Sequence, residues 1–210
     1  MLDLYCERTS ASLFGEPLNA VTNLAYFAAA WAVWRLRTPS PSTAAVLSSL
    51  LAAVGVGSLL FHTLATPWAR ILDRLPILLF QLAFLWLYGT RIVKIASLPM
   101  AALLTGFLIA VWAGARSPDF LNGSLIYAPA LGLALGISVL HYRTQSHGRL
   151  TLPAAVGIFI AAVIFRTVDH AVCQTVPIGT HFLWHLLTAV ALCLLARGLV
   201  LNLPAPRRAA

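Results

Sequence analysis

Two histidines at helical spacing give the strongest chemical signal in the sequence. His181 and His185 lie four residues apart in the stretch HFLWH, so a helix would present both from one face. Two imidazoles at that spacing can bind one tetrahedral zinc ion. A packed or interfacial histidine pair has the same spacing, so this motif alone leaves ligation open.

A second stretch, GSLLFHTLATPWARILD, adds three more polar residues. Ser58 and His62 are again four residues apart, and Asp73 follows His62 by eleven residues. Three histidines and a water molecule make a catalytic zinc site with an open position. Zinc makes such a water acidic enough to supply hydroxide near neutral pH. Asp73 could orient this water or accept its proton, and Ser58 could donate a hydrogen bond to the polarised carbonyl or to a developing oxyanion.

The composition places these residues in a membrane protein. Of the 210 residues, 60% are hydrophobic and only 10% are charged, whereas about 25% of the residues in a soluble domain are charged. The net charge of +8 does not indicate nucleic-acid binding, because the arginines are scattered at helix ends and Lys94 is the single lysine. We find no polar linker, which predicts one domain over residues 1–210, and the polar start MLDLYCERTSASLFG predicts no cleavable signal peptide.

Seven apolar stretches are long enough to cross a bilayer as helices, which takes about 20 residues each. We therefore predict an all-α, polytopic membrane protein built as a seven-transmembrane helix bundle. The predicted spans cover residues 18–36, 44–65, 74–93, 98–115, 120–142, 151–171 and 180–201.

The distribution of positive charge predicts the orientation of this bundle. Seven spans put the termini on opposite sides, with nine basic residues on the C-terminal side and five on the other. Because cytoplasmic loops carry the excess of Lys and Arg, we expect the C-terminus in the cytoplasm and the N-terminus outside. The nine are Arg35, Arg37, Arg91, Lys94, Arg143, Arg149, Arg197, Arg207 and Arg208.

Ionisable residues gather at the predicted outer end of the bundle. All six acidic residues and four of the six histidines fall there, and ionisable residues within a membrane protein indicate function by default. Structural interpretations stay open for each residue. Ser58 can bond to a carbonyl of its own helix, Asp73 can pair with Arg70 or Arg74, and His62 can be a buried imidazole. One joint site is favoured because five polar residues share the same depth in the bundle, namely Ser58, His62, Asp73, His181 and His185.

The residues resemble the alkaline ceramidases, which belong to a wider group of seven-span membrane hydrolases that includes the adiponectin-receptor-like proteins. The motifs are SLLFH at 58–62, then Asp73, then HFLWH at 181–185. Three further stretches are similar to that branch. They are YCE at 5–7 (W-C-E in the family), EPLNAVTN at 16–23 (E-x-x-N-x-x-[ST]-N) and VDHAVC at 168–173.

This resemblance implies zinc-dependent hydrolysis of a lipid amide, from ceramide to a fatty acid and a sphingoid base. His62, His181 and His185 would bind Zn²⁺, Asp73 would handle the proton, and Ser58 would donate to the carbonyl. The site would face the periplasm if the protein lies in a bacterial inner membrane, or the lumen if it lies in an endoplasmic reticulum or Golgi membrane.

The resemblance also implies a calcium site in the N-terminal segment, although the pattern is incomplete. Leu4 stands where the family has an aspartate, and Thr9 stands where it has an asparagine. Carboxylates suit a hard cation such as Ca²⁺, and the alternative is an acidic cap that pairs with Arg8. The candidate ligands are Asp3, Glu7 and Glu16.

The resemblance further points to a disulfide between Cys6 and Cys173, both of which fall on the predicted outer side, where an oxidising compartment would permit it. Cys193 falls within a span and is interpreted as an inert thiol. Asp169 and His170 could orient a zinc ligand, but we favour a structural role such as helix capping or pairing with Arg166.

Three competing functions stay open at the level of the sequence. The same zinc chemistry could act on another acyl amide or ester lipid, since the lysine-poor composition indicates a bacterial source, where sphingolipids are rare. A seven-span lipid receptor could hold a structural zinc through the three histidines and Asp73, because structural zinc has four protein ligands. A haem protein with His62 and either His181 or His185 as axial ligands would leave Asp73 and Ser58 without a role.

Overall fold

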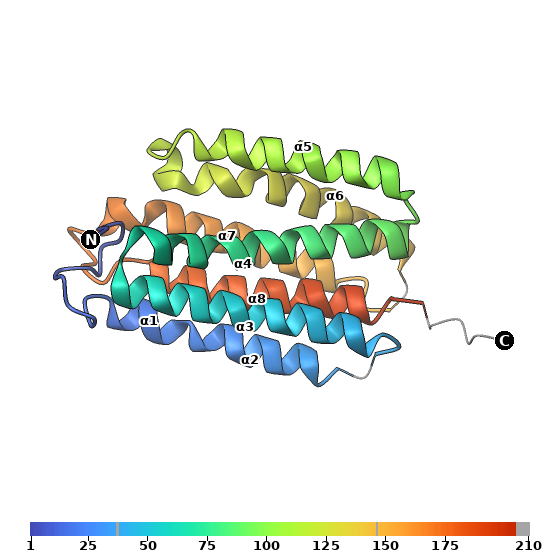
Figure 1. Cartoon of the computed structure of the whole chain (residues 1–210), viewed down its shortest axis with the longest axis horizontal. Coiled ribbons are helices and arrows are strands. Elements are labelled where there is room, and N and C mark those ends of the chain that lie inside the picture. Colours follow the sequence, from blue (N-terminus) through green and yellow to red (C-terminus); the bar gives the residue numbers. More distant parts are fainter. Residues whose placement is uncertain (37, 146, 205–210) are drawn as a thin grey trace.

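A computed structural model describes residues 1–36, 38–145 and 147–204 of the chain. Within these ranges every regular element is helical, which confirms the all-α prediction. The helices lie side by side as one elongated bundle (Figure 1). Arg37, Arg207 and Arg208, which enter the orientation argument, lie outside the described residues.

The elements follow one another along the chain with short connections. They are α1 (Pro17–Thr22), α2 (Leu24–Trp34), α3 (Pro41–Leu64), α4 (Pro67–Leu87), the π-helix η1 (Tyr88–Val93), α5 (Ser97–Ala115), the 3-10 helix η2 (Phe120–Tyr127), α6 (Ala128–Thr144), α7 (Thr151–Val172) and α8 (His181–Val200).

Six helical segments among the described residues are long and apolar enough to cross a membrane, and each matches a predicted span. They cover Pro41–Leu64, Pro67–Val93, Ser97–Ala115, Phe120–Thr144, Thr151–Val172 and His181–Val200. The first predicted span, 18–36, is instead divided at Asn23 into α1 of 6 residues and α2 of 11 residues. Neither piece alone is long enough to cross the bilayer.

Asn23 divides this span because its side chain competes for backbone carbonyls. Its Nδ2 donates to the carbonyl of Asn19 at 2.8 Å and to that of Ala20 at 3.3 Å. The backbone of Asn23 keeps right-handed helical angles (φ −65°, ψ −16°), so the chain continues in the same direction. In Figure 1, α1 and α2 run end to end along α3.

Helix α8 is the central helix of the part of the bundle that holds the histidines. It packs against α7, α2 and α3 and buries residues on all sides, as a helix that is apolar all round is expected to do. Helices α3 and α4 approach most closely at Gly57, where an added Cβ would lie 2.0 Å from the carbonyl oxygen of Leu72. Only glycine permits this contact.

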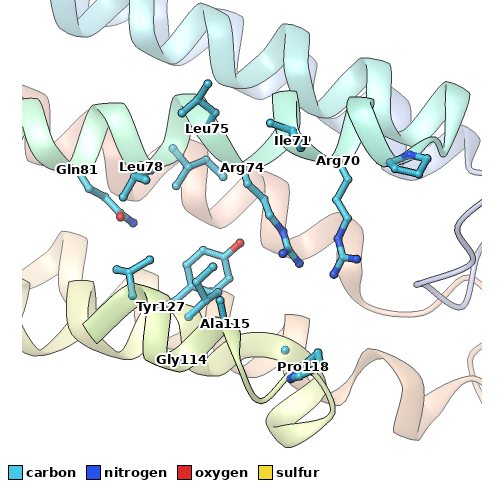
Figure 2. Close-up of a pocket in the computed structure, with 15 residues that line it drawn as sticks. Arg70, Ile71, Arg74, Leu75, Leu78, Gln81, Gly114, Ala115, Pro118 and Tyr127 are labelled. Atoms are coloured by element: carbon cyan, nitrogen blue, oxygen red, sulfur yellow. The ribbon is translucent and has the colours of Figure 1, made fainter. Parts of the chain in front are cut away.

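The packing between α4 and the α5–η2 pair is looser and leaves a cavity of about 500 Å³ near the N-terminal end of α4 (Figure 2). Its far wall is η2, which contains three left-handed residues, Leu121, Asn122 and Gly123. Arg166 of α7 holds this turn, since its Nη1 donates to the carbonyl of Asn122 at 2.7 Å and to Ser124 Oγ at 2.8 Å. The predicted span at 120–142 is therefore regular only from α6 onward.

Candidate metal centre

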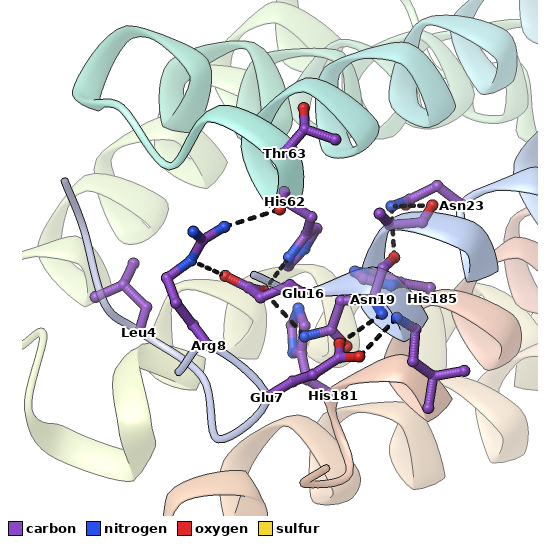
Figure 3. A network of polar contacts seen from close by, with 12 residues as sticks. Leu4, Glu7, Arg8, Glu16, Asn19, Asn23, His62, Thr63, His181 and His185 are labelled. Carbon is purple, nitrogen blue, oxygen red and sulfur yellow. Dashed lines mark hydrogen bonds and ion pairs between the residues drawn. The ribbon is translucent and has the colours of Figure 1, made fainter. Parts of the chain in front are cut away.

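The three histidines of the zinc prediction meet at one end of the bundle. His62 lies in the last turn of α3, and His181 and His185 lie in the first two turns of α8. One ligand atom from each lies within 4.8 Å of the other two. The ring centroids are 4.6 to 5.2 Å apart, and all three side chains are buried (Figure 3). We call these three residues the histidine cluster.

Each imidazole of the cluster has one buried nitrogen without a hydrogen-bond partner. These atoms are His62 Nε2, His181 Nδ1 and His185 Nε2. Buried polar atoms are nearly always paired, so three orphaned nitrogens on neighbouring rings indicate an electron-pair acceptor between them. Zinc takes imidazole nitrogen readily, and the cluster therefore fits the zinc ion that the sequence predicts.

Three protein ligands leave a tetrahedral ion one open position. Within residues 1–36, 38–145 and 147–204, no fourth histidine, cysteine or carboxylate joins the group. Asp73 in particular is not a member. The group therefore has the number of protein ligands that catalytic zinc sites have.

The second nitrogens of two rings are fixed by side chains from the N-terminal part of the chain. His62 Nδ1 donates to Glu16 Oε2 at 2.5 Å, and His185 Nδ1 donates to Thr22 Oγ1 at 3.0 Å, since the Thr22 hydroxyl itself donates to the carbonyl of Leu18. Such bonds set the tautomer and the orientation of a ligating ring. They leave Nε2 of both histidines free to face the centre of the cluster.

Glu16 is held in its charged form by its partners. Burial alone would raise the pKa of its carboxyl group, but the hydrogen bond from His62 and further bonds from Asn19 and Arg8 lower it below the usual value. The Arg8 guanidinium pairs directly with Glu16 and also donates to the carbonyl of His62 at 2.8 Å. A buried carboxylate thus lies between a cation and an imidazole of the histidine cluster.

His181 is positioned by a different set of contacts. Its ring stacks on that of Tyr5, with centroids 3.5 Å apart and an interplanar angle of 15°. Asp169 caps the start of α8, because its Oδ1 accepts from the backbone N–H groups of Thr180 at 2.6 Å and His181 at 2.9 Å. The sequence favours a cap on the helix that contains Asp169, or a pair with Arg166, whereas the observed cap is on the following helix, α8, which carries two candidate ligands.

The N-terminal segment is tied over this end of the bundle. Cys6 and Cys173 form the disulfide that the resemblance implies, with Cα atoms 5.2 Å apart. The Cys6 N–H also donates to Asp169 Oδ2 at 3.0 Å, and His170 Nε2 donates to the carbonyl of Leu4 at 2.7 Å. These contacts hold Tyr5 and Arg8 against the histidine cluster.

Asp73 and Ser58 lie on the neighbouring helices α4 and α3. The close approach at Gly57 brings the backbone of Asp73 beside the residue that precedes Ser58. Burial raises the pKa of Tyr5 to about 12, and while the charge of Arg166 opposes that shift, the charge of Asp73 adds to it. Among the described residues Asp73 forms no ion pair with Arg70 or Arg74.

The three candidate calcium ligands are not brought together. Glu7 accepts from the backbone N–H groups of Leu18 at 2.6 Å and Asn19 at 2.7 Å, at the start of α1. Glu16 is occupied by Arg8 and His62, and Asp3 is exposed. In the described part of the chain, these three residues do not form a group with ligand spacing. The alternative of an acidic cap that pairs with Arg8 matches the observed contact of Glu16.

An apolar cavity lies inside the bundle along α8. Trp184 and Thr188, one residue before and three residues after His185, line it together with Phe80, Phe84 and Phe159. Tyr26 also lines it and bonds through its hydroxyl to Thr188 Oγ1 at 2.5 Å. We call this space the apolar cavity.

Comparison with protein-family models finds a match over residues 4–201 to the model described as Ceramidase. The chain belongs to the ceramidase family. The match covers nearly the whole chain and includes the histidine cluster, Ser58 and Asp73. A comparison with curated proteins finds no match. Membership of the ceramidase family implies a hydrolase that acts on an amide bond of a lipid, and it agrees with the apolar helices in indicating an integral membrane protein.

Two residues of this ceramidase-family site were not predicted from the sequence. Tyr5 and Thr22 contact the histidine cluster, yet neither is a usual metal ligand. Tyr5 adjoins Cys6 in the YCE motif, and Thr22 lies in the EPLNAVTN motif. The motifs themselves were therefore the available signal, although they could not tell which side chain faces the site.

Proposed function

We propose that the protein is a zinc-dependent hydrolase that cleaves the amide of ceramide or of a closely related acyl lipid, giving a fatty acid and an amine. The observation that carries the proposal is the set of three orphaned, buried imidazole nitrogens in the histidine cluster. Family membership supports the amide bond as the target, and the three-ligand arrangement supports a catalytic metal.

Each residue of the site has a role in this reaction. Zinc held by His62, His181 and His185 would polarise the amide carbonyl and acidify a water molecule. The Asp73 carboxylate accepts the proton of the attacking water and passes it to the departing amine nitrogen. The Ser58 hydroxyl donates a hydrogen bond to the carbonyl oxygen as negative charge develops on it. Glu16 and Thr22 keep two of the rings in the required tautomer.

The apolar cavity supports a lipid substrate. Its walls are almost entirely hydrocarbon and aromatic, and it adjoins the residue between the two ligands of α8. An acyl chain that lies in this space would present its amide carbonyl to the histidine cluster. Burial of the chain contributes roughly 0.8 kcal/mol for each methylene, which suits a long-chain amide better than a short one.

We further propose that α1 and α2 together make the seventh span, with the N-terminus and the histidine cluster on the periplasmic or lumenal side. The two helices run end to end over residues 17–34 (Figure 1), and the disulfide suits an oxidising compartment. Single cysteines introduced at Ser12 and at His147, in a background without Cys193, test this orientation. A membrane-impermeant thiol reagent applied from outside is expected to label position 12 and not position 147.

Metal analysis of purified protein tests the central claim. Wild-type protein is expected to contain nearly one zinc ion for each chain, and His181→Ala is expected to lose most of it. His147→Ala is the matched control, because His147 is exposed and lies outside the cluster. Zinc retained by His181→Ala would contradict the site. Release of fatty acid from a panel of N-acyl sphingoid bases and other acyl lipids then identifies the substrate.

A further inference from the structure

Two arginines enter the cavity between α4 and η2, and no carboxylate is among the residues that line it. Arg70 and Arg74 are one helical turn apart, and Figure 2 shows both side chains extending from α4 into the cavity. The ion pairs in the described part of the chain all involve Glu16. Arg70 Nε is also buried and has no hydrogen-bond partner. Buried donors are usually paired, so Arg70 offers this cavity an unused donor for a bound acceptor.

The rest of the cavity matches a lipid headgroup region and not an aqueous ion site. Leu75, Leu78 and Ile126 line its walls, while Gln81 and Tyr127 add polar groups. Arg166 lies behind the wall, where an added Cβ on Gly123 would be 3.8 Å from its Nη2. Its guanidinium is already used by Asn122 and Ser124, but its charge adds to the positive potential of the cavity. We call this space the arginine cavity.

The arginine cavity is next to the apolar cavity. Ile77 and Gln81 line both it and the apolar cavity. Tyr127 lines the arginine cavity and packs on Trp184, with ring centroids 4.6 Å apart. Asp73 is three residues from Arg70 and four from Ile77, so it shares a helix face with both. A lipid amide at Asp73 would therefore place its headgroup within reach of the arginines.

We propose that the arginine cavity binds an oxyanion on the headgroup of the substrate, so that the preferred substrate is an N-acyl lipid with a phosphate-type group close to its amide. That the bound lipid is a substrate depends on the proposed hydrolase function. The anion site itself depends only on Arg70 and Arg74. Guanidinium groups bind phosphate and carboxylate oxygens through paired, charge-assisted hydrogen bonds. A neutral ceramide would leave both arginines without a partner.

Lipid binding by the full chain in neutral phosphatidylcholine nanodiscs tests the proposal. All variants carry Asp73→Asn, so that lipids bind without being hydrolysed. The probes are an N-acyl sphingoid base and the same lipid with phosphate on its primary hydroxyl. The phosphorylated lipid is expected to bind about 10- to 100-fold more tightly, since each charge-assisted bond contributes roughly tenfold in affinity. Arg70→Gln with Arg74→Gln is expected to remove this preference.

The matched control is Arg116→Gln, which removes the same charge near the same end of the bundle. Arg116 lies outside the cavity lining, and its guanidinium packs over Trp112 at 4.9 Å. It is expected to leave the preference unchanged. Equal affinity for the two lipids, or a preference that survives in the double variant, would overturn the proposal. So would equally strong competition by phosphatidylglycerol or by inorganic phosphate, because either result indicates a general anion site.

Hydrolysis assays on the chain with Asp73 intact separate this inference from the proposed function. Cleavage of the neutral lipid without any phosphate preference in binding or in kcat/KM would leave the hydrolase function and overturn the anion site. Arginine-dependent binding of the phosphorylated lipid without cleavage of either lipid would leave the anion site and overturn the hydrolase function. Cleavage that is faster for the phosphorylated lipid, and that loses this advantage in the double arginine variant, supports both.

Discussion

At the scale of single residues, the histidine cluster depends on side chains that are not themselves candidate metal ligands. Glu16 is the most important of them, because it joins the His62 imidazole to the Arg8 guanidinium in a buried chain of charge. A carboxylate that accepts from a ligating histidine raises the basicity of the ring and fixes its tautomer. Asn19 supports the same carboxylate with a bond of 3.0 Å.

Glu16→Gln is expected to weaken zinc affinity about 10- to 100-fold, the usual effect of losing such a partner. The amide can still accept from His62 Nδ1, but it lacks the charge that makes the imidazole more basic. Competition with a chromophoric chelator measures the Kd for zinc. Glu7→Gln is the control, since Glu7 caps α1 and does not touch the histidines. Equal zinc affinity in wild type and Glu16→Gln would show that Glu16 has no influence on the metal.

Arg8 places a fixed positive charge at the carboxylate that calcium would need. It pairs with Glu16 and donates to the carbonyls of His62 at 2.8 Å and Ser10 at 3.3 Å. Carboxylate and carbonyl oxygens are the ligands that Ca²⁺ prefers, so Arg8 occupies the oxygens that a calcium ion would need. We therefore expect millimolar Ca²⁺ to leave the unfolding temperature of the zinc-loaded protein unchanged. A ligand at 100 times its Kd would add about 2.7 kcal/mol of stability. A rise in unfolding temperature with Ca²⁺, but not with Mg²⁺ at equal ionic strength, would contradict this expectation.

At the scale of elements, the position of the metal centre depends on where α8 begins. Both α8 histidines of the cluster lie in its first two turns, so fraying of this end would separate them. Asp169 prevents fraying by accepting from the first backbone N–H groups of the helix. Gly179, which has a φ of +65°, makes room for this cap. An added Cβ there would lie 2.2 Å from Asp169 Oδ1 and 2.8 Å from the Cβ of Cys6.

Gly179→Ala is therefore expected to lower both stability and zinc affinity. Strain at a left-handed residue costs about 1–3 kcal/mol, which lowers the unfolding temperature of a chain of this size by roughly 2–4 °C for each kcal/mol. Gly106→Ala is the matched control. Gly106 lies within α5, where an added Cβ meets nothing within 4 Å, so alanine is expected to be neutral or slightly stabilising. Equal melting curves and zinc contents for the two variants would rule out the cap as a determinant of the site.

At the scale of the whole molecule, sequence patterns predicted the helical segments well but did not predict contacts between residues that are distant in sequence. Apolar runs located the six spanning segments, and the four-residue spacing placed His181 and His185 on one face. No pattern could show that Glu16 reaches His62, because that contact joins the N-terminal segment to α3 across 46 residues. The division at Asn23 and the left-handed turn at Leu121–Gly123 depend on side-chain bonds to the backbone, which hydropathy does not record.

The disulfide between Cys6 and Cys173 also acts on the whole molecule. It closes most of the chain into one loop, with a sequence separation of 167. It fixes the N-terminal segment, whose Tyr5 and Arg8 touch the cluster, to the end of α7 beside the Asp169 cap. A disulfide of this kind contributes about 2–4 kcal/mol. Cys6→Ala with Cys173→Ala is therefore expected to lower the unfolding temperature by roughly 5–15 °C, measured by differential scanning fluorimetry of zinc-loaded protein.

Zinc affinity is expected to fall in the same double variant, because the released segment no longer holds Tyr5 against His181 or Glu16 against His62. Cys193→Ala, which removes the remaining free thiol, is the control and is expected to change neither quantity. A reducing agent should reproduce the double variant in wild-type protein and have no effect on the double variant itself. If the unfolding temperature falls but zinc affinity does not, the bundle holds the histidine cluster together without the N-terminal segment, and the positioning role of that segment is wrong.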